Sequence, residues 1–132
     1  MAFMAINDPE FWRTGPEFLE RIKHQAEEYG LKVANFLMGA PQDDQAPVAT
    51  VMHMPPNFVL ARHSHDCYRV EVIVQGSVDT GERVLRAGDV MVSAPNEFYG
   101  PHTAGPEGSL SVEIFSRAKA QQAISVEGAD TA

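Results

Sequence analysis

Two histidines, His63 and His65, stand one residue apart in a segment of extended character. Side chains alternate along a strand with a period of two, so the two imidazoles are predicted to lie on the same face. Two imidazoles side by side can bind the same metal ion. Residues with turn-forming or chemical character follow at fixed distances, namely Gly76, Gly88, Asp89, Pro95, Tyr99 and His102. The histidine pair is therefore the first candidate for a functional site.

This spacing resembles the first part of the cupin superfamily signature. Both histidines and the closing Gly76 match, and Asn57 stands where the leading glycine would be, a residue type that also serves in turns. Arg69 occupies the position of the usual glutamate ligand. The resemblance covers residues 48–116. It implies an all-β fold, a small double-stranded β-helix or jelly-roll barrel, with a divalent metal inside.

The second part of the signature is less complete. It begins at Gly88, and the positions of the usual proline, glycine and histidine hold Ala94, Asn96 and Tyr99. Pro95 and His102 lie nearby in a shifted register. The resemblance therefore implies that Tyr99 lies near the metal position, as a tyrosine does in some metal-dependent cupin lyases.

Three residues are candidates to replace the missing glutamate. Glu71 lies two residues beyond Arg69, on the same face of the strand, and Tyr99 and His102 follow later. The resemblance with these donors implies a metal site of His63, His65, Glu71 and His102. Such a set suits Fe(II), Mn, Ni or Zn, and the choice of metal stays open.

Residues 69–74 alternate strictly between two kinds of side chain, and two orientations follow. The pattern alone favours burial of Val70, Val72 and Val74, with Arg69 and Glu71 as a surface ion pair. The resemblance favours the opposite, with Arg69 and Glu71 inside the barrel and paired to each other. The valines would then be covered by the amino-terminal helix or by a second subunit.

The first thirty residues have helical character. Asp8-Pro9 predicts a short helical turn, and a capping box from Thr14 to Glu17 predicts the start of an amphipathic helix over residues 15–29. Gly30 is placed to end it. His24, among charged neighbours on this helix, is predicted to be a solvated surface residue.

Past Gly30, short apolar runs alternate with turn residues, which indicates an antiparallel sandwich or barrel. The segment Gly105–Gly108 is interpreted as a turn, and the small, polar tail from Arg117 as loosely ordered at its end. The predicted organisation is a single domain over residues 1–132, with a helical segment at 8–30, a barrel at 31–116 and a tail at 117–132.

Composition restricts the class of protein. The net charge of −8 and the absence of a basic cluster disfavour nucleic acid and anionic membranes as partners. No secretory signal or membrane-spanning stretch is recognised, so a cytoplasmic location is expected. Cys67, the single cysteine, is interpreted as a small buried hydrophobe, and His53 as a secondary site candidate.

Two functions remain open. The first is a mononuclear metal enzyme that oxygenates, isomerises or cleaves a small anionic molecule, with Arg69 and Tyr99 as catalytic candidates. Arg69 would hold a carboxylate or enolate, or else only neutralise Glu71, and Tyr99 would exchange a proton. The second is a metal-free cupin that binds a small ligand as a sensor or accessory module. The resemblance also implies a homodimer.

Overall fold

Strands are the main regular structure of the protein, as the alternation of apolar runs and turn residues predicts. The structure, a computed structural model, describes residues 1–126. In this part of the chain the strands are β1 (Lys32–Leu37), β2 (Val48–Met54), β3 (Val59–Leu60), β4 (His63–His65), β5 (Arg69–Asp79), β6 (Val84–Arg86), β7 (Val90–Ser93), β8 (His102–Phe115) and β9 (Ile124–Val126).

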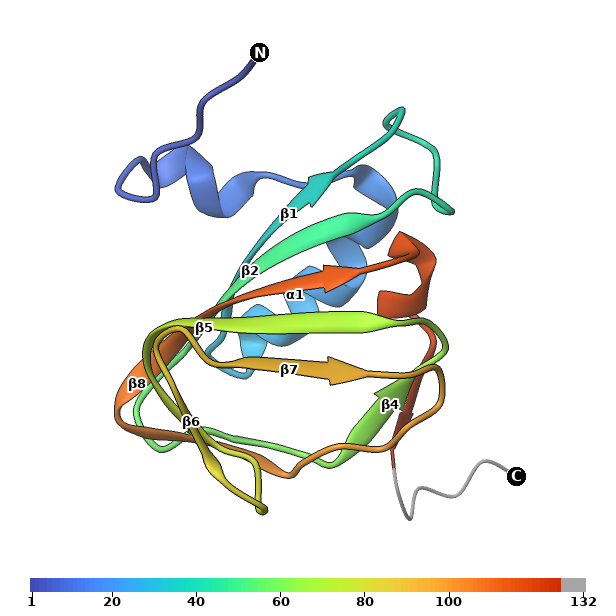
Figure 1. The fold of residues 1–132 in the computed structure, drawn as a ribbon. Coiled ribbons are helices and arrows are strands. Elements are labelled where there is room, and N and C mark those ends of the chain that lie inside the picture. Colours follow the sequence, from blue (N-terminus) through green and yellow to red (C-terminus); the bar gives the residue numbers. More distant parts are fainter. Residues whose placement is uncertain (127–132) are drawn as a thin grey trace.

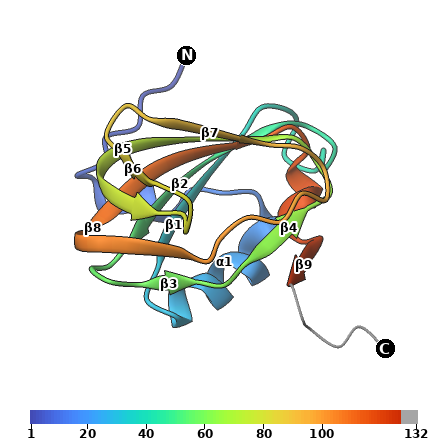
Figure 2. The ribbon, with the colours of Figure 1, turned by 60° about the horizontal axis from the view of Figure 1, so that its bottom comes forward.

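Apart from the pair β4 and β9, the strands are arranged as one curled antiparallel sheet (Figures 1 and 2). Its order is β1-β2-β8-β5-β6, with β3 also on β8 and β7 also on β5. The long strands β5 and β8 each exchange partners along their length. β5 pairs first with β7 and then with β6, while β8 pairs first with β3 and then with β2. These two strands therefore run through both halves of a barrel, which confirms the predicted all-β fold class.

The bend in β5 requires Gly76. This residue has a φ of 74°, and an added Cβ would come within 2.0 Å of the carbonyl oxygen of Gly108. The pairing of β5 with β8 shifts register on both sides of it. The predicted turn at Gly105–Gly108 is wrong, because this segment lies inside β8 as a bulge opposite the bend.

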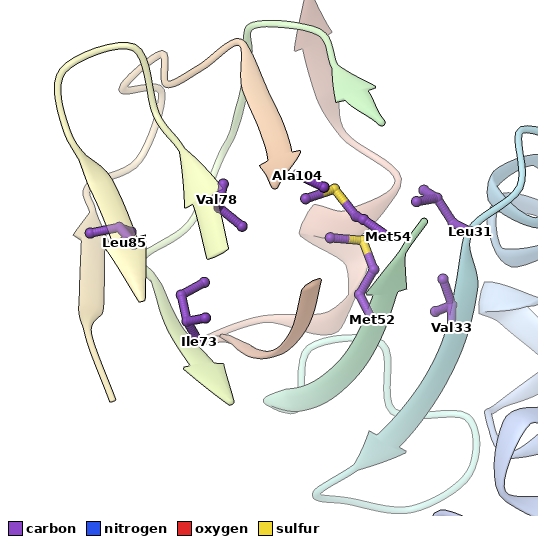
Figure 3. Packing of buried hydrophobic residues seen from close by; sticks show 8 residues of the cluster. All are labelled: Leu31, Val33, Met52, Met54, Ile73, Val78, Leu85 and Ala104. Atoms are coloured by element: carbon purple, nitrogen blue, oxygen red, sulfur yellow. The ribbon is translucent and has the colours of Figure 1, made fainter. Parts of the chain in front are cut away.

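The barrel interior has an apolar half and a polar half. The apolar half contains eight buried side chains from facing strands (Figure 3), namely Leu31, Val33, Met52, Met54, Ile73, Val78, Leu85 and Ala104. Burial of a large apolar side chain contributes about 2 kcal/mol. This packing holds the strands that carry the polar half in place.

The amino-terminal segment is helical but begins differently from the prediction. Asp8 caps the predicted short turn, η1 (Pro9–Arg13), by accepting from the Glu10 amide. The capping box is wrong, because the Thr14 hydroxyl donates to the Glu10 carbonyl and the Thr14 carbonyl accepts from Asn35 of β1. After η2 (Glu17–Leu19), the helix α1 is Glu20–Glu28.

The helix α1 covers the inner side of the sheet (Figures 1 and 2). Ile22 and Ala26 line an interior cavity together with Thr50 and Met52 of β2. The alternative in which this helix covers Val70, Val72 and Val74 is therefore wrong, and Val74 is 43% exposed. In the described residues no helix is long and apolar enough to span a membrane.

The carboxyl-terminal segment contributes to the barrel. Residues Ala118–Gln121 form the short helix η3, in which Ala118 and Ala120 are fully buried, and β9 then pairs with β4. The predicted tail therefore has a defined structure up to Val126. Its end, which we expected to be loosely ordered, lies outside the described residues.

Candidate functional site

The backbone places Tyr99 beside the histidine pair. His63 and Tyr99 exchange two main-chain hydrogen bonds, of 3.1 and 3.0 Å, and the amide of Asn96 donates to the carbonyl of His65 at 2.7 Å. Asn96 has a φ of 64° and Asn57 a φ of 63°, the left-handed conformation that glycine adopts most easily. Both asparagines thus perform the backbone role of the glycines that they replace in the resemblance.

Main-chain carbonyls hold both imidazoles in a defined tautomer. The Nδ1 atom of His63 lies 2.7 Å from the Ala61 carbonyl, and that of His65 lies 2.8 Å from the Ala120 carbonyl. A carbonyl only accepts, so Nδ1 donates in each ring and Nε2 keeps a lone pair. The lone pair of His63 accepts from the Tyr99 hydroxyl at 3.0 Å.

Tyr99 is at the centre of an aromatic cluster. Its ring centroid lies 4.6 Å from that of His63, 6.3 Å from that of His65 and 5.3 Å from that of His102. The guanidinium carbon of Arg69 lies 4.1 Å from the same centroid, a cation–π geometry. The phenol therefore contacts all three histidines and the buried cation.

Arg69 and Glu71 face the interior, each 1% exposed, and are paired, as the resemblance implies. Nη1 of Arg69 lies 3.2 Å from Oε1 of Glu71 and 2.9 Å from Oε1 of Glu113. Sequence reasoning missed Glu113. This residue lies directly opposite Glu71 on β8, a register that places two carboxylates on one guanidinium.

Burial shifts the ionisation of the site. It lowers the pKa of His63, His65 and His102, and the charge of Arg69 lowers these values further, with that of His65 reaching about 4. Burial raises the pKa of Tyr99. Burial and the neighbouring Glu71 raise the pKa of Glu113 to about 8 against the attraction of Arg69. At neutral pH the imidazoles are thus uncharged and the phenol is protonated.

The four predicted metal ligands do not form a preassembled metal site. In residues 1–126, no group of three or more His, Cys, Asp or Glu side chains is placed to hold a metal ion. The carboxylate of Glu71 is bound by Arg69, and Nε2 of His63 is occupied by the Tyr99 hydroxyl. Nε2 of His102 is buried and has no hydrogen-bond partner among the described residues. The ligand set stays a prediction.

Arg69 also has unsatisfied donors. Its Nε and Nη2 atoms are buried without a hydrogen-bond partner in the described part of the chain. Tyr99 covers the face of the guanidinium, and Glu71 and Glu113 occupy Nη1. The Nε–Nη2 edge, with two parallel N–H groups, is the side from which guanidinium binds a carboxylate with two hydrogen bonds.

Residues of the site line a cleft and a smaller cavity. A cleft of about 460 Å³ is lined by Tyr99 and His102 together with β7, the loop at 97–100, Arg62 and residues 80–82. A cavity of about 120 Å³ beneath α1 is lined by His63, His65 and Glu113. Ligand pockets usually measure about 300–1,000 Å³, so only the cleft is large enough for an organic molecule.

The remaining candidates lie elsewhere. Cys67 is buried in the apolar cluster of Leu19 and Phe115, as interpreted from the sequence. The side chain of His24 is 68% exposed, as predicted. His53 lines a separate cleft with Gln75 and Ser109, so it does not join the histidine cluster.

Known proteins with a similar structure identify the fold. No protein-family model and no curated protein matches the sequence. An RmlC-like cupin from Shewanella frigidimarina is similar in structure, with a TM-score of 0.58 and 23% identity over 70% of this chain and 81% of that one. An RmlC-like cupin from Ralstonia eutropha gives a TM-score of 0.52 and 20% identity, over 66% of this chain but only 56% of that one.

A third similar structure is oxalate decarboxylase from Bacillus subtilis, a protein with Mn(II) centres. Its TM-score is 0.53, with 16% identity over 67% of this chain and 26% of that much longer one. All three likenesses have low sequence identity, so they concern the fold alone. Together with the curled antiparallel sheet and the histidine pair on β4, they establish that this chain has the fold of the cupin superfamily.

Proposed function

We propose that the barrel binds a small organic anion at the free edge of Arg69, beside three neutral imidazoles. The observation that carries the proposal is the pair of buried, unpartnered donors, Nε and Nη2 of Arg69. Buried polar groups in proteins are nearly always hydrogen-bonded, so two adjacent donors on a 1% exposed side chain call for an acceptor. A carboxylate or enolate has the matching pair of oxygens.

The pair of Tyr99 and His63 makes this site capable of proton transfer. The phenol donates to Nε2 of His63, whose Nδ1–H is held by the Ala61 carbonyl. Because the pKa of Tyr99 is raised and that of His63 is lowered, the proton rests on the phenol at neutral pH. A ligand oxygen that gains negative charge next to Tyr99 takes up this hydrogen bond. Such an arrangement suits isomerisation or elimination of an anion.

Binding of simple carboxylates tests the proposal. We expect acetate, pyruvate or benzoate to raise the melting temperature and to bind measurably by calorimetry. Arg69→Lys keeps the charge but loses the two-pronged edge, so we expect it to weaken binding by about tenfold or more. The exposed Arg86 provides the matched control, Arg86→Lys, which should bind like the parent. The proposal fails if no monoanion binds, or if folded Arg69→Lys binds as tightly as the parent.

A second candidate function is metal-dependent, with Fe, Mn, Ni or Zn bound by His63 and His65. The specific observation in its favour is that both Nδ1 atoms donate to main-chain carbonyls. Metal-binding histidines in proteins are generally held in this way, with the other nitrogen turned to the ion. Glu71 and His102 remain the proposed further ligands, and a bound ion would polarise the anion.

The proposed partner of the chain is a second copy, bound through the outer face of the sheet. Two rows of side chains cross β1, β2, β8, β5 and β7 without a polar residue. They are Ala34-Val51-Val112-Val72-Val90 and Phe36-Ala49-Ile114-Val70-Val92. Val92 is 64% exposed and Val90 53% exposed. A continuous apolar face of this kind is typical of a protein–protein interface, and two such faces pack as a sandwich.

Native mass spectrometry after addition of each metal tests both ideas. We expect a dimer, and about one metal ion per chain that is lost in His65→Ala. Val92→Asp should give monomers, whereas Val84→Asp, at a 40% exposed site on β6, should leave the dimer intact. Metal-free spectra under every condition contradict the metal-dependent function, and a monomeric parent contradicts the interface. We also propose that the protein is cytoplasmic and that it binds neither nucleic acid nor membranes.

A further inference from the structure

We infer that Gln121 is a positioning residue for His65. Its side chain fixes the main-chain carbonyl that holds this imidazole, so that the Nε2 lone pair is presented to the cavity beneath α1. The inference rests on the proposed function only in that His65 belongs to the candidate site. It gives residues 117–126, which follow the part of the chain that the resemblance covers, a role in that site.

The two histidines of β4 differ in which nitrogen atoms are already bonded. Nε2 of His63 accepts from the Tyr99 hydroxyl. Nε2 of His65 has no hydrogen-bond partner among residues 1–126, and the ring lines the cavity beneath α1. A lone pair on a neutral imidazole accepts from a donor group or binds a metal ion. His65 is therefore the histidine whose Nε2 is open to a ligand without displacing Tyr99.

The acceptor that fixes the proton on Nδ1 of His65 comes from a distant segment. Nδ1 lies 2.8 Å from the carbonyl of Ala120, which is 55 residues away in the sequence. Nδ1 of His63 is held instead by Ala61, only two residues before it. A neutral imidazole carries one proton on either nitrogen, and the tautomer follows the hydrogen bond that is available. The tautomer of His65 thus depends on how residues 117–126 are docked, whereas that of His63 does not.

Gln121 anchors the orienting carbonyl to the main sheet. This carbonyl belongs to the peptide unit between Ala120, whose side chain is fully buried, and Gln121, which is 7% exposed. The Gln121 amide donates to the hydroxyl of Thr50 on β2 and, at 3.2 Å, to Oδ1 of Asn35 on β1. The Thr50 hydroxyl donates to the same oxygen at 2.8 Å. A shift of the segment would break these buried bonds, which is costly, so the carbonyl is held in one place.

The same segment also holds the histidine strand and forms a wall of the cavity. β9 pairs with β4 (Figure 2), with Ile124 opposite His65. Directly after His65, Asp66 forms an ion pair of 2.7 Å with Arg117. Gln121 and Ile124 line the cavity together with His65. Residues 117–126 are therefore part of the site and not an appendage of the barrel.

The tautomer of each imidazole is measured directly by long-range proton–nitrogen correlation NMR at neutral pH. In the parent, we expect His63 and His65 to carry the proton on Nδ1. Gln121→Met keeps the length of the side chain but removes both donated bonds. It should move the tautomer ratio of His65 about fivefold toward Nε2–H, the effect of losing one ordinary hydrogen bond, and leave His63 unchanged. Lys119→Ala, at a 55% exposed side chain on η3, is the control and should change neither ring.

A second variant tests the same anchor from the side of the sheet. Thr50→Val removes the hydroxyl that accepts from Gln121 and leaves the glutamine in place. We expect it to shift the tautomer ratio of His65 in the same direction, again without a change in His63. This variant gives the answer even if Gln121→Met does not fold.

The outcomes separate this inference from the proposed function. The inference is wrong if His65 carries its proton on Nε2 in the parent, or if the folded variants keep the parent's tautomer ratio. A shift of His63 together with His65 would indicate general loosening of β4 and would also overturn it. If neither a carboxylate nor a metal ion binds the parent, the proposed function fails, whereas the tautomers of the two rings still decide the role of Gln121.

Discussion

Replacement of Arg69 by methionine is expected to lower the free energy of unfolding by about 3–5 kcal/mol. The guanidinium separates two buried carboxylates, Glu71 and Glu113, that lie opposite each other on β5 and β8. Methionine fills much of the volume but leaves the buried Glu71 carboxylate without its cation, while Glu113 keeps its proton below about pH 8. A domain of this size has about 5–15 kcal/mol of stability in total, so this single change would remove a large part of it.

A rescue variant separates this charge effect from loss of packing. In Arg69→Met/Glu71→Gln/Glu113→Gln the carboxylates are gone and the two amides are able to bond to each other. We expect the triple variant to regain most of the lost stability in urea unfolding. Arg86→Met, at an exposed site on β6, should stay within about 0.5 kcal/mol of the parent. A loss below about 1 kcal/mol in the single variant, or a triple variant no more stable than it, contradicts the buried network.

Replacement of Glu113 by glutamine is expected to change how stability depends on pH. The pKa of Glu113 rises in the folded state from about 4.5 to about 8, chiefly because of burial. The folded chain therefore keeps this proton between pH 4.5 and 8 while the unfolded chain releases it. Glu113 thus contributes stability at low pH that is lost as the pH rises through about 8. Glutamine stays neutral at every pH and removes the loss.

The size of the expected change in stability follows from the pKa shift of Glu113. Each pH unit between the two pKa values is worth about 1.4 kcal/mol, so the advantage of the glutamine variant should grow to several kcal/mol, on the order of 5, by pH 9. Glutamine also accepts from Arg69 and donates to Glu71, so the two proteins should be similar at pH 5. Urea unfolding at pH 5, 7 and 9 measures the difference, and parallel curves for the two proteins would refute the shift.

The three buried histidines change the pH dependence of stability in the opposite direction to Glu113. They provide a comparison within the same protein. Because burial lowers the pKa of His63, His65 and His102, their contribution is complete above about pH 6.5 and is lost as the pH falls, toward about 4 for His65. This acid-side loss should appear equally in the parent and in Glu113→Gln. Only the loss that develops between about pH 4.5 and 8 should differ between them.

Local sequence rules predicted the parts of the site that depend on few residues. The period of two along a strand placed His63 and His65 together, and the resemblance placed Arg69 and Glu71 inside the barrel. Asn57 and Asn96 stand at turn positions because asparagine tolerates the left-handed conformation there. Gly76 matched the closing glycine of the resemblance, and the structure supplies the reason, because a side chain there would meet the Gly108 carbonyl. The histidine pair and the two asparagines are each determined within a strand or a turn.

Tertiary structure decided everything that depends on the register between distant segments. Glu113 joins Arg69 across 44 residues of sequence, and no local periodicity reveals that β8 aligns it with Glu71. The alternation of residues 69–74 alone favours the valines inside, and the tertiary structure instead buries Arg69 and Glu71 on the side of the sheet that α1 covers. The carbonyl of Ala120 orients His65 from the far end of the chain. Side-chain alternation is a local property of the backbone, whereas the pairing of buried charges depends on which strands the whole barrel brings together.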